Sequence, residues 1–212
     1  QLFDADWRFH LGDLRNAEVP DFDDSSWRRL DVPHDWSIED LPRRTFGENL
    51  AAIWAAGEFP PRVGPFDRQL SPGQTATGYV LGGTGWYRKH FSIAHLPADR
   101  HFEIRFDGVY MDSDVWLNGR HLGNHPYGYT SFAYDLTPHL NRDRDNVIAV
   151  RVRNEGKNSR WYSGSGIFRH VWLTTTQDLR IPLWGVYVTT PEVSSSSAKV
   201  NISTKVENRS NA

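Results

Sequence analysis

Hydrophobic and polar residues alternate in two stretches of this chain, and strict alternation is the pattern of β-strands that bury one face. Successive side chains of a strand point to opposite faces, so each stretch predicts one set of core residues and one set directed toward solvent. The residues predicted to face the core are Phe102, Ile104, Phe106, Ile148, Val150 and Val152, and those predicted to face solvent are Glu103, Arg105, Asp107, Ala149, Arg151 and Arg153.

A tight hairpin is predicted within residues 114–122, where apolar residues flank Asn118-Gly119. That pair favours a type I′ turn, because both of its central positions need positive φ. No segment keeps an apolar stripe of helical period over three turns, so helix is expected only as a single turn at 23–27 and a short helix at 51–56. Strands separated by Gly, Pro, Asn and Asp turns predict an all-β, antiparallel sandwich.

Two places interrupt this succession of strands. Residues 41–84 hold few strand signals and many Gly and Pro residues, which predicts a long loop, either functional or inserted. After Thr176, residues 185–189 and 199–206 have the pattern of two strands around a serine-rich turn. Two strands cannot bury a core by themselves. We therefore predict two domains, residues 1–178 and residues 179–212, with the second represented only by its opening hairpin.

Composition narrows the classes of function. The chain has 212 residues and a net charge of −2, so nothing in its electrostatics favours nucleic acid or an anionic membrane surface as a partner. No apolar run approaches the roughly 20 residues needed to cross a bilayer. The absence of cysteine removes disulfides, thiol catalysis and cysteine-ligated zinc. It leaves the compartment open, since a periplasmic, secreted or cytoplasmic location agrees with this composition.

Other clusters suggest chemistry without supporting it. Asp21, Asp23 and Asp24 are oxygen-rich, but the twelve-residue calcium loop is missing, so a solvated acidic turn is favoured. Ser163-Gly-Ser-Gly166 falls on a β-turn and not between a strand and a helix, which disfavours a nucleophile elbow. His34 is expected to serve packing or orientation. No pair of carboxylates stands in a sequence context typical of a catalytic acid and nucleophile.

Two segments, one around Trp36 and one around Trp161, combine charged residues and tryptophan with turns, which suits a rim that contacts a sugar. With three further segments they occur in the order found in one enzyme family: Phe22–Ile38, Gly85–Phe91, Phe106–Gly119, Gly128–Thr137 and Asn158–Leu173. On these segments the chain resembles the amino-terminal sugar-binding domain of glycoside hydrolase family 2, the β-galactosidase and β-glucuronidase group. The joint occurrence of Pro33-His-Asp-Trp36 and Ser159-Arg-Trp-Tyr162 is most similar to the bacterial β-galactosidase branch.

This resemblance implies a galactose-binding-like jelly roll over residues 1–178 and the start of an immunoglobulin-like sandwich over residues 179–212. It implies a parent enzyme that hydrolyses terminal β-galactosides with retention and without a cofactor. The family's catalytic glutamates lie in a (β/α)₈ barrel, which needs about 250 residues of its own. We therefore expect no catalytic residue in this chain. The expected partners are a carbohydrate and the downstream immunoglobulin-like and barrel domains, and a homo-oligomer of the parent stays open.

The resemblance also names candidate sugar contacts. Asp35 and Arg160 would be polar contacts, because a carboxylate accepts from sugar hydroxyls and a guanidinium donates along a planar fork. Trp36 and Trp161 would be supporting walls. The alternative is structural: Asp35 and Arg160 would pair with each other, and the two tryptophans would be core residues beneath the rim. Arg160 stands where one branch of the family has an Asp that ligates sodium, so no metal site is expected.

Three interpretations follow from these observations. The first is the sugar-binding domain of a multidomain glycoside hydrolase. The second is a carbohydrate-binding module that works alone, which independent affinity for a sugar would identify. The third is a structural or interaction sandwich, whose mark would be Trp36 and Trp161 buried with no cleft between their loops.

Overall fold

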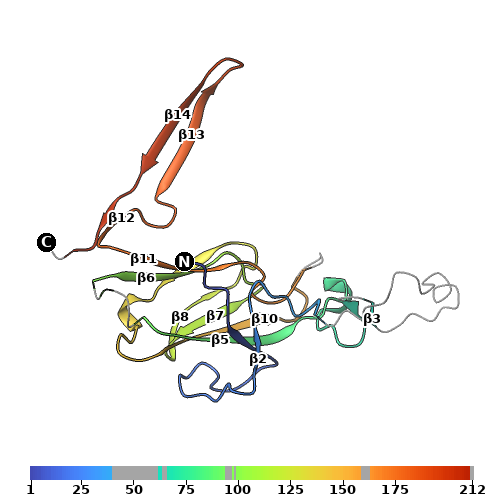
Figure 1. Ribbon diagram of the computed structural model, residues 1–212. Helices are drawn as coiled ribbons and strands as arrows, with labels where there is room; N and C mark the ends of the chain where they lie inside the picture. The colour runs from blue at the N-terminus through green and yellow to red at the C-terminus, as the bar shows by residue number, and fades with distance from the viewer. Residues whose placement is uncertain (40–61, 64–65, 94–96, 98, 159–162, 211–212) are drawn as a thin grey trace.

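A computed structural model describes residues 1–39, 62–63, 66–93, 97, 99–158 and 163–210 of the chain. Antiparallel strands build a sandwich of a larger sheet, in the order β2-β1-β5-β10-β7-β8, and a smaller sheet, in the order β11-β6-β9 (Figure 1). The predicted all-β antiparallel fold is confirmed. No helix among the described residues is long and apolar enough to cross a membrane.

The larger sheet consists of β1 (Trp7–Leu11), β2 (Arg28–Leu30), β5 (Gly83–Phe91), β7 (Ser113–Leu117), β8 (Arg120–His125) and β10 (Asn146–Asn154). The smaller sheet consists of β6 (His101–Phe106), β9 (Phe132–Asp135) and β11 (Val171–Thr176). The short elements are β3 (Arg62–Val63), β4 (Phe66–Asp67), β12 (Leu179–Arg180), β15 (Glu207–Asn208) and the 3₁₀ turns η1 (Gln74–Thr77) and η2 (Thr137–His139). A separate hairpin is formed by β13 (Val186–Val193) and β14 (Ala198–Thr204).

The main core lies between the two sheets. All six residues predicted to face it are buried, three from β6 and three from β10. Phe106 of β6 stacks on Phe132 of β9, with ring centroids 5.1 Å apart. The alternation of β6 and β10 was therefore sufficient to predict which of their faces packs inward.

One residue predicted to face solvent does not. Ala149 of β10 is fully buried in a second cluster on the outer face of the larger sheet, together with Ala17, Trp27 and Trp86. The cause is the segment between β1 and β2, which folds back over this face and carries Ala17 and Trp27 against it. Period two identifies the two faces of a strand, but it does not tell whether another segment covers the outer one.

The predicted type I′ turn is confirmed, since Asn118 and Gly119 have φ of 51° and 80° between the paired β7 and β8. The single turn predicted at 23–27 is present: Trp27 N–H donates to Asp24 C=O at 3.0 Å, and Asp23 Oδ1 accepts from the backbone N–H of Ser25 at 3.0 Å, as a capping side chain does. It does not continue as a helix, because the chain enters β2 at Arg28. The short helix predicted at 51–56 lies outside the described residues.

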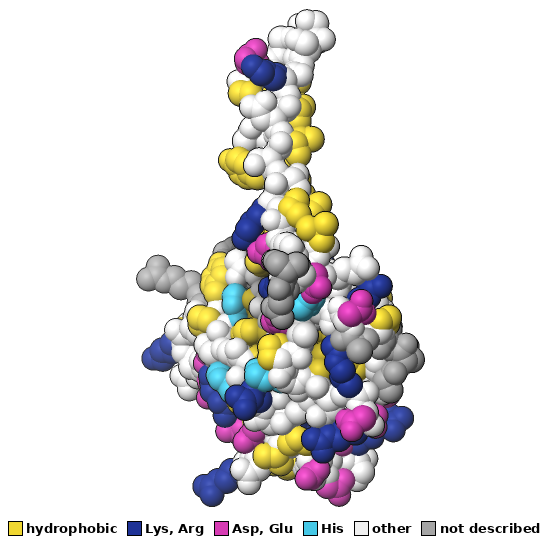
Figure 2. Space-filling view, turned by 90° about the vertical axis from the view of Figure 1, so that its left-hand side faces the viewer, with side chains coloured by type: hydrophobic (Ala, Val, Ile, Leu, Met, Phe, Trp, Pro, Cys, Tyr) yellow, Lys and Arg dark blue, Asp and Glu magenta, His cyan; other side chains and the backbone are white. Residues whose placement is uncertain are grey.

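The β13–β14 hairpin stands away from the sandwich (Figure 1). Residues paired across the two strands point to the same face of the hairpin. One of its two faces carries apolar side chains and threonines and no charged residue. These apolar residues are Val186, Val188, Val193, Ala198, Val200 and Ile202. They are solvent-exposed, and Figure 2 shows hydrophobic side chains along this projecting part. The hairpin therefore has an apolar face and no layer to cover it among the described residues.

Candidate functional site

Two loops meet at one end of the sandwich, and Asp35 lies where they join. The loop that follows β2 pairs with the loop that precedes β11 through their backbones. His34 N–H donates to Ile167 C=O at 2.7 Å, and Trp36 N–H donates to Ser165 C=O at 3.0 Å. This ladder fixes one loop on the other, although they are about 130 residues apart in the chain.

The Asp35 carboxylate is anchored through one of its oxygens. Its Oδ1 accepts from the backbone N–H of Ser37 at 2.9 Å and from that of Ser165 at 2.8 Å. The carboxylate also packs flat against Gly164, where a Cβ would overlap Oδ2. Within the described residues, Oδ2 has no hydrogen-bond partner. The carboxylate is half-buried, and its two bonds through Oδ1 fix its orientation.

Trp36 lies beneath this rim and is only 4% exposed. Its indole N–H donates to Gly82 C=O at 3.0 Å, and its ring stacks on Phe9 with centroids 5.7 Å apart. A Cβ on Gly85 would come within 2.8 Å of the indole, so glycine is needed there for the ring to fit. Its place suits a support beneath the rim; that role stays a prediction. Arg160 and Trp161, the other two predicted contacts, lie outside the described residues.

His34 holds the underside of the same loop. Its Nε2 meets the Glu39 carboxylate, which makes Nε2 the protonated nitrogen of a neutral ring. Nδ1 is then the acceptor for the Tyr87 hydroxyl, 2.6 Å away. Burial lowers the pKa of His34 below its ordinary value, and this outweighs the opposing effect of Glu39. Burial also raises the pKa of Tyr87 well above its usual range, so both groups are neutral near pH 7. The expected orienting role of His34 thus has named partners.

Sequence reasoning missed a buried polar chain beneath Asp35. Ser37 Oγ lies 2.8 Å from Ser165 Oγ, which also accepts from Asn154 Nδ2 at 2.8 Å. Asn154 Nδ2 lies 3.1 Å from Gly164 C=O as well. All three side chains are buried. Serine and asparagine are ordinary loop residues, and their partners are far apart in sequence, so no local signal could have identified this chain.

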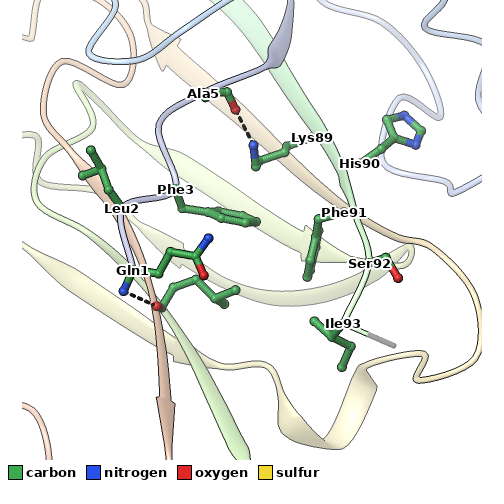
Figure 3. A pocket seen from close by; sticks show the side chains of 10 residues that line it. Gln1, Leu2, Phe3, Ala5, Lys89, His90, Phe91, Ser92 and Ile93 are labelled. Atoms are coloured by element: carbon green, nitrogen blue, oxygen red, sulfur yellow. Dashed lines mark hydrogen bonds between the residues drawn. The ribbon is translucent and has the colours of Figure 1, made fainter. Parts of the chain in front are cut away.

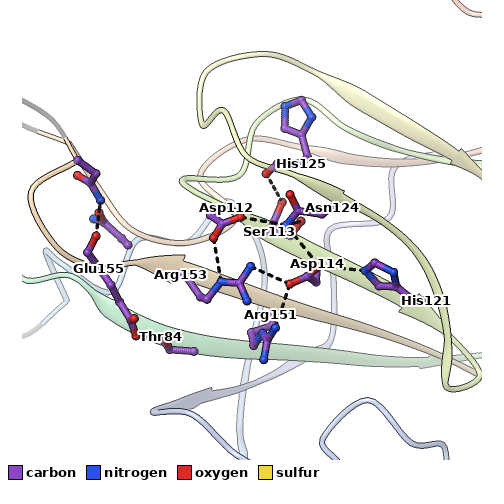
Figure 4. Close-up of polar contacts among 12 residues, drawn as sticks. Thr84, Asp112, Ser113, Asp114, His121, Asn124, His125, Arg151, Arg153 and Glu155 are labelled. Atoms are coloured by element: carbon purple, nitrogen blue, oxygen red, sulfur yellow. Dashed lines mark hydrogen bonds and ion pairs between the residues drawn. The ribbon is translucent and has the colours of Figure 1, made fainter.

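A network of charges covers the part of the outer sheet face formed by β7, β8 and β10 (Figure 4). Asp114 accepts from Arg151 at 3.1 Å and from Arg153 at 3.0 Å, and Asp112 accepts from Arg153 Nε at 2.9 Å. Burial would raise the pKa of both carboxyls, but hydrogen bonds from the arginines hold each pKa below its usual range. Both are ionised and paired, so neither is suited to donate a proton as a glycosidase acid must.

A cavity among the described residues lies elsewhere. It has a volume of about 270 Å³ and is lined by residues 1–3 and by β5 around Lys89 (Figure 3). The Lys89 ammonium donates to Ala5 C=O and lies 4.5 Å from the centroid of the Phe3 ring. Six residues of strand, or about 20 Å, separate Lys89 from the rim end of β5 at Gly83. The cavity is therefore separate from the Asp35 rim, and its lysine is already held.

Comparison with known proteins identifies the family to which the chain is similar. Residues 2–177 match the family described as glycosyl hydrolases family 2, sugar binding domain. A β-galactosidase of Bacteroides ovatus is 48% identical over 98% of the chain, and a β-glucuronidase of Formosa agariphila is 30% identical over 97% of it. The crystal structure of a β-glycosidase from Bacteroides vulgatus superimposes with a TM-score of 0.81 at 34% identity, over 100% of this chain.

The chain spans only a part of these proteins, namely 22% and 21% of the two enzymes and 24% of the crystallised chain. The match nevertheless covers nearly all of the sandwich, and the jelly-roll fold that the resemblance implied is confirmed. The chain therefore belongs to glycosyl hydrolase family 2, as its amino-terminal sugar-binding domain.

Proposed function

We propose that this domain forms one wall of the substrate pocket of a retaining β-galactosidase. The observation that carries the proposal is the Asp35 carboxylate. It is fixed by two backbone amides through Oδ1, and its Oδ2 lies at the meeting point of two rim loops. A carboxylate held in this way needs no reorganisation to accept a hydrogen bond from a sugar hydroxyl, and such fixed polar groups give a pocket its specificity.

The charge of Asp35 favours a neutral sugar over an acidic one. A glucuronide carries its own carboxylate, which a carboxylate at the rim would repel, whereas the hydroxyls of a galactoside can all donate to it. The relatives include both β-galactosidases and β-glucuronidases. Of the two activities, the galactosidase agrees better with the rim.

The hydrolytic chemistry itself would come from a barrel domain of the intact protein. A retaining glycosidase uses two carboxylates about 5 to 5.5 Å apart, one as nucleophile and one as acid and base. In this proposal Asp35 touches the sugar and takes no part in proton transfer or covalent chemistry. Arg160 and Trp161 would complete the polar contact and the wall.

Asp35→Asn in the intact protein should lower kcat/KM for p-nitrophenyl β-D-galactopyranoside about tenfold. The amide keeps the shape, and its oxygen can still accept from Ser37 and Ser165. An NH2 group, which only donates, then stands where Oδ2 accepted from the sugar hydroxyl, and the loss of this bond is expected to cost about 1.4 kcal/mol. The same substitution should raise the low activity on p-nitrophenyl β-D-glucuronide relative to the galactoside, because the repulsion is removed. Initial rates on the two substrates measure both effects.

Asp21→Asn is the matched control, since Asp21 is exposed on the segment between β1 and β2. It should leave both rates unchanged. A wild-type preference for the glucuronide, or equal rates for Asp35→Asn and Asp21→Asn, would remove Asp35 from the sugar site.

We further propose that residues 179–212 are the opening hairpin of an immunoglobulin-like sandwich. The support is the single apolar face of β13 and β14, which is the pattern of a strand pair that packs against a second sheet. Val188 and Ile202 face each other at its centre, and Ile202 is 67% exposed. A two-stranded ribbon with this pattern is stable only when another layer covers it.

Ile202→Thr tests this arrangement. In the 212-residue chain the substitution should change stability by less than about 0.5 kcal/mol, because the side chain is already exposed. In the intact protein it should destabilise the domain by about 2 kcal/mol, because a covered methyl pair is lost and a hydroxyl is buried. Asn201→Thr, on the opposite face, should be neutral in both proteins. Equal effects of Ile202→Thr in the two proteins would contradict a covered hairpin. Thermal and urea unfolding of each variant and of the wild type, in the 212-residue chain and in the intact protein, measure these changes.

A further inference from the structure

Three further loops lie at the same end of the sandwich as Asp35: the loop before β11, the loop between β6 and β7, and the loop between β8 and β9. The last two continue the rim that Asp35 and the loop before β11 begin. The loop between β6 and β7 joins the loop before β11, because Tyr110 and Gly166 exchange two backbone hydrogen bonds of 2.9 Å. The loop between β8 and β9 joins next, with Asp112 N–H donating to Pro126 C=O at 3.2 Å. The rim thus runs without a break from Asp35 to the residues that follow Pro126.

Exposed tyrosines occupy this far part of the rim. Tyr127 is 58% exposed and Tyr129 is 43% exposed. Their ring centroids are 5.7 Å apart, and Tyr129 meets the buried Tyr110 at 5.1 Å. Phe168, from the loop before β11, lies 6.5 Å from Tyr129. Gly128 separates the two tyrosines, and a Cβ there would overlap the Tyr110 ring.

The tyrosines are held in place before any ligand arrives. Tyr129 rests on Tyr110, and its loop is closed by His125 and Thr130, whose Nε2 and Oγ1 are 3.1 Å apart. Tyrosine offers a large, rigid and amphipathic contact at a low cost in side-chain entropy. Exposed rings that the fold has already ordered are therefore suited to binding.

Polar groups beside the rings indicate the class of ligand. The Arg169 guanidinium lies over Phe168, 5.1 Å from the ring centroid, and is exposed. Asn124 of β8 donates to Asp112, the residue just before β7, at 2.9 Å, and Asp112 also pairs with Arg153. Aromatic faces flanked by donors and acceptors match a pyranose, which has apolar C–H faces and a belt of hydroxyls.

We propose that Tyr127 and Tyr129 form a second sugar contact, which binds a further residue of an oligosaccharide whose terminal galactose lies at Asp35. The inference rests on the proposed function, because it extends the same rim from a monosaccharide site to an oligosaccharide site. The occupant is a neutral pyranose stacked on the tyrosines.

The test compares two substrates of the intact protein, one long enough to reach the tyrosines and one too short. Tyr127→Ala and Tyr129→Ala should each lower kcat/KM for β-1,4-linked galactotriose about fivefold, as expected for one lost ring contact. They should change kcat/KM for p-nitrophenyl β-D-galactopyranoside less than twofold. Tyr129→Phe keeps the ring and should behave like the wild type. Tyr187→Ala, which removes an exposed tyrosine from the hairpin, is the matched control.

Equal losses on both substrates, or no loss on galactotriose, would overturn the second contact. If the wild type does not cleave the aryl galactoside, the proposed function fails separately. The tyrosines are then judged by ring NMR signals of the 212-residue chain titrated with galactotriose. Saturable shifts of Tyr127 and Tyr129, with Tyr187 unmoved, would support the contact, and unmoved rings would reject it.

Discussion

Replacing Arg88 by methionine should destabilise the protein by about 3 to 5 kcal/mol, the cost of breaking a buried ion pair from one side. Arg88 of β5 is fully buried, and each of its three donor nitrogens is used. Its Nε donates to Asp24 at 2.7 Å, Nη1 donates to Ala17 C=O and to Val19 C=O at 3.0 Å, and Nη2 donates to Pro20 C=O at 3.1 Å. Methionine fills part of the space but leaves a carboxylate and three carbonyls without this partner. The midpoint of urea unfolding measures the loss.

Arg29→Met is the control, because Arg29 on β2, at the edge of the same sheet, is exposed and makes a long contact of 3.8 Å with Asp6. We expect it to change stability by less than about 0.5 kcal/mol. Arg88→Lys should recover only part of the loss, since an ammonium keeps the charge but cannot reproduce the planar fork. A cost for Arg88→Met as small as that of Arg29→Met would mean that the segment between β1 and β2 is held by its apolar residues alone.

The loss should also depend on pH. Burial would raise the pKa of Asp24, but hydrogen bonds from Arg88 and His90 outweigh it and hold the pKa below the ordinary value of 3.8. A lowered pKa stabilises the fold above the ordinary value, and this contribution disappears as the pH falls through the folded-state pKa. In the Arg88→Met variant, much of this contribution is missing even at neutral pH, because the hydrogen bond from Arg88 that lowers the pKa is lost. The stability difference between wild type and Arg88→Met should therefore be largest above about pH 4 and should narrow in acid.

These residues also show why part of the fold could be predicted from the sequence and part could not. Alternation in β6 and β10, and the Asn118-Gly119 turn, are local patterns, and local patterns were sufficient for them. Asp24 was expected in a solvated acidic turn, yet it is buried. Its environment is set by Arg88, 64 residues further along the chain. Neither the residue types nor their spacing reveals that a loop will fold over the outer face of the sheet.

The candidate site was likewise predictable from the sequence in part only. Asp35 was named from the resemblance to a family, and the structure places it at the junction of two loops. What orients it could not be predicted, because Ser165 and Gly164 act on Asp35 through a backbone N–H and through the lack of a side chain. A backbone donor leaves no trace in the sequence, and glycine is common in turns for several reasons. The polar chain through Asn154 was missed for another reason, because its serine and asparagine side chains come from segments far apart in the sequence.

Gly166 is a residue of the rim that must be glycine for reasons of both space and backbone conformation. Its φ of 128° is a conformation that side-chain-bearing residues rarely adopt. A Cβ here would overlap the Tyr87 hydroxyl and would lie 2.7 Å from the backbone oxygen of His34. Tyr87 cannot give way without breaking its bond of 2.6 Å to His34 Nδ1. The same glycine exchanges two backbone bonds with Tyr110, so both halves of the rim meet at this position.

Gly166→Ala should therefore destabilise the protein by about 3 kcal/mol, part from backbone strain and part from displaced neighbours. Gly83→Ala separates these causes, because Gly83 has a φ of 102° but nothing within 4 Å of a built Cβ. It should cost only about 1 kcal/mol, the strain alone. Urea unfolding measures both variants. Since the overlap pushes on His34 and Tyr87, Gly166→Ala should also lower kcat/KM for the aryl galactoside in the intact protein, whereas Gly83→Ala should leave it near the wild-type value. Equal losses of stability in Gly166→Ala and Gly83→Ala would show that backbone strain is the only reason for a glycine at position 166. The packing of Tyr87 and His34 would then not support Asp35.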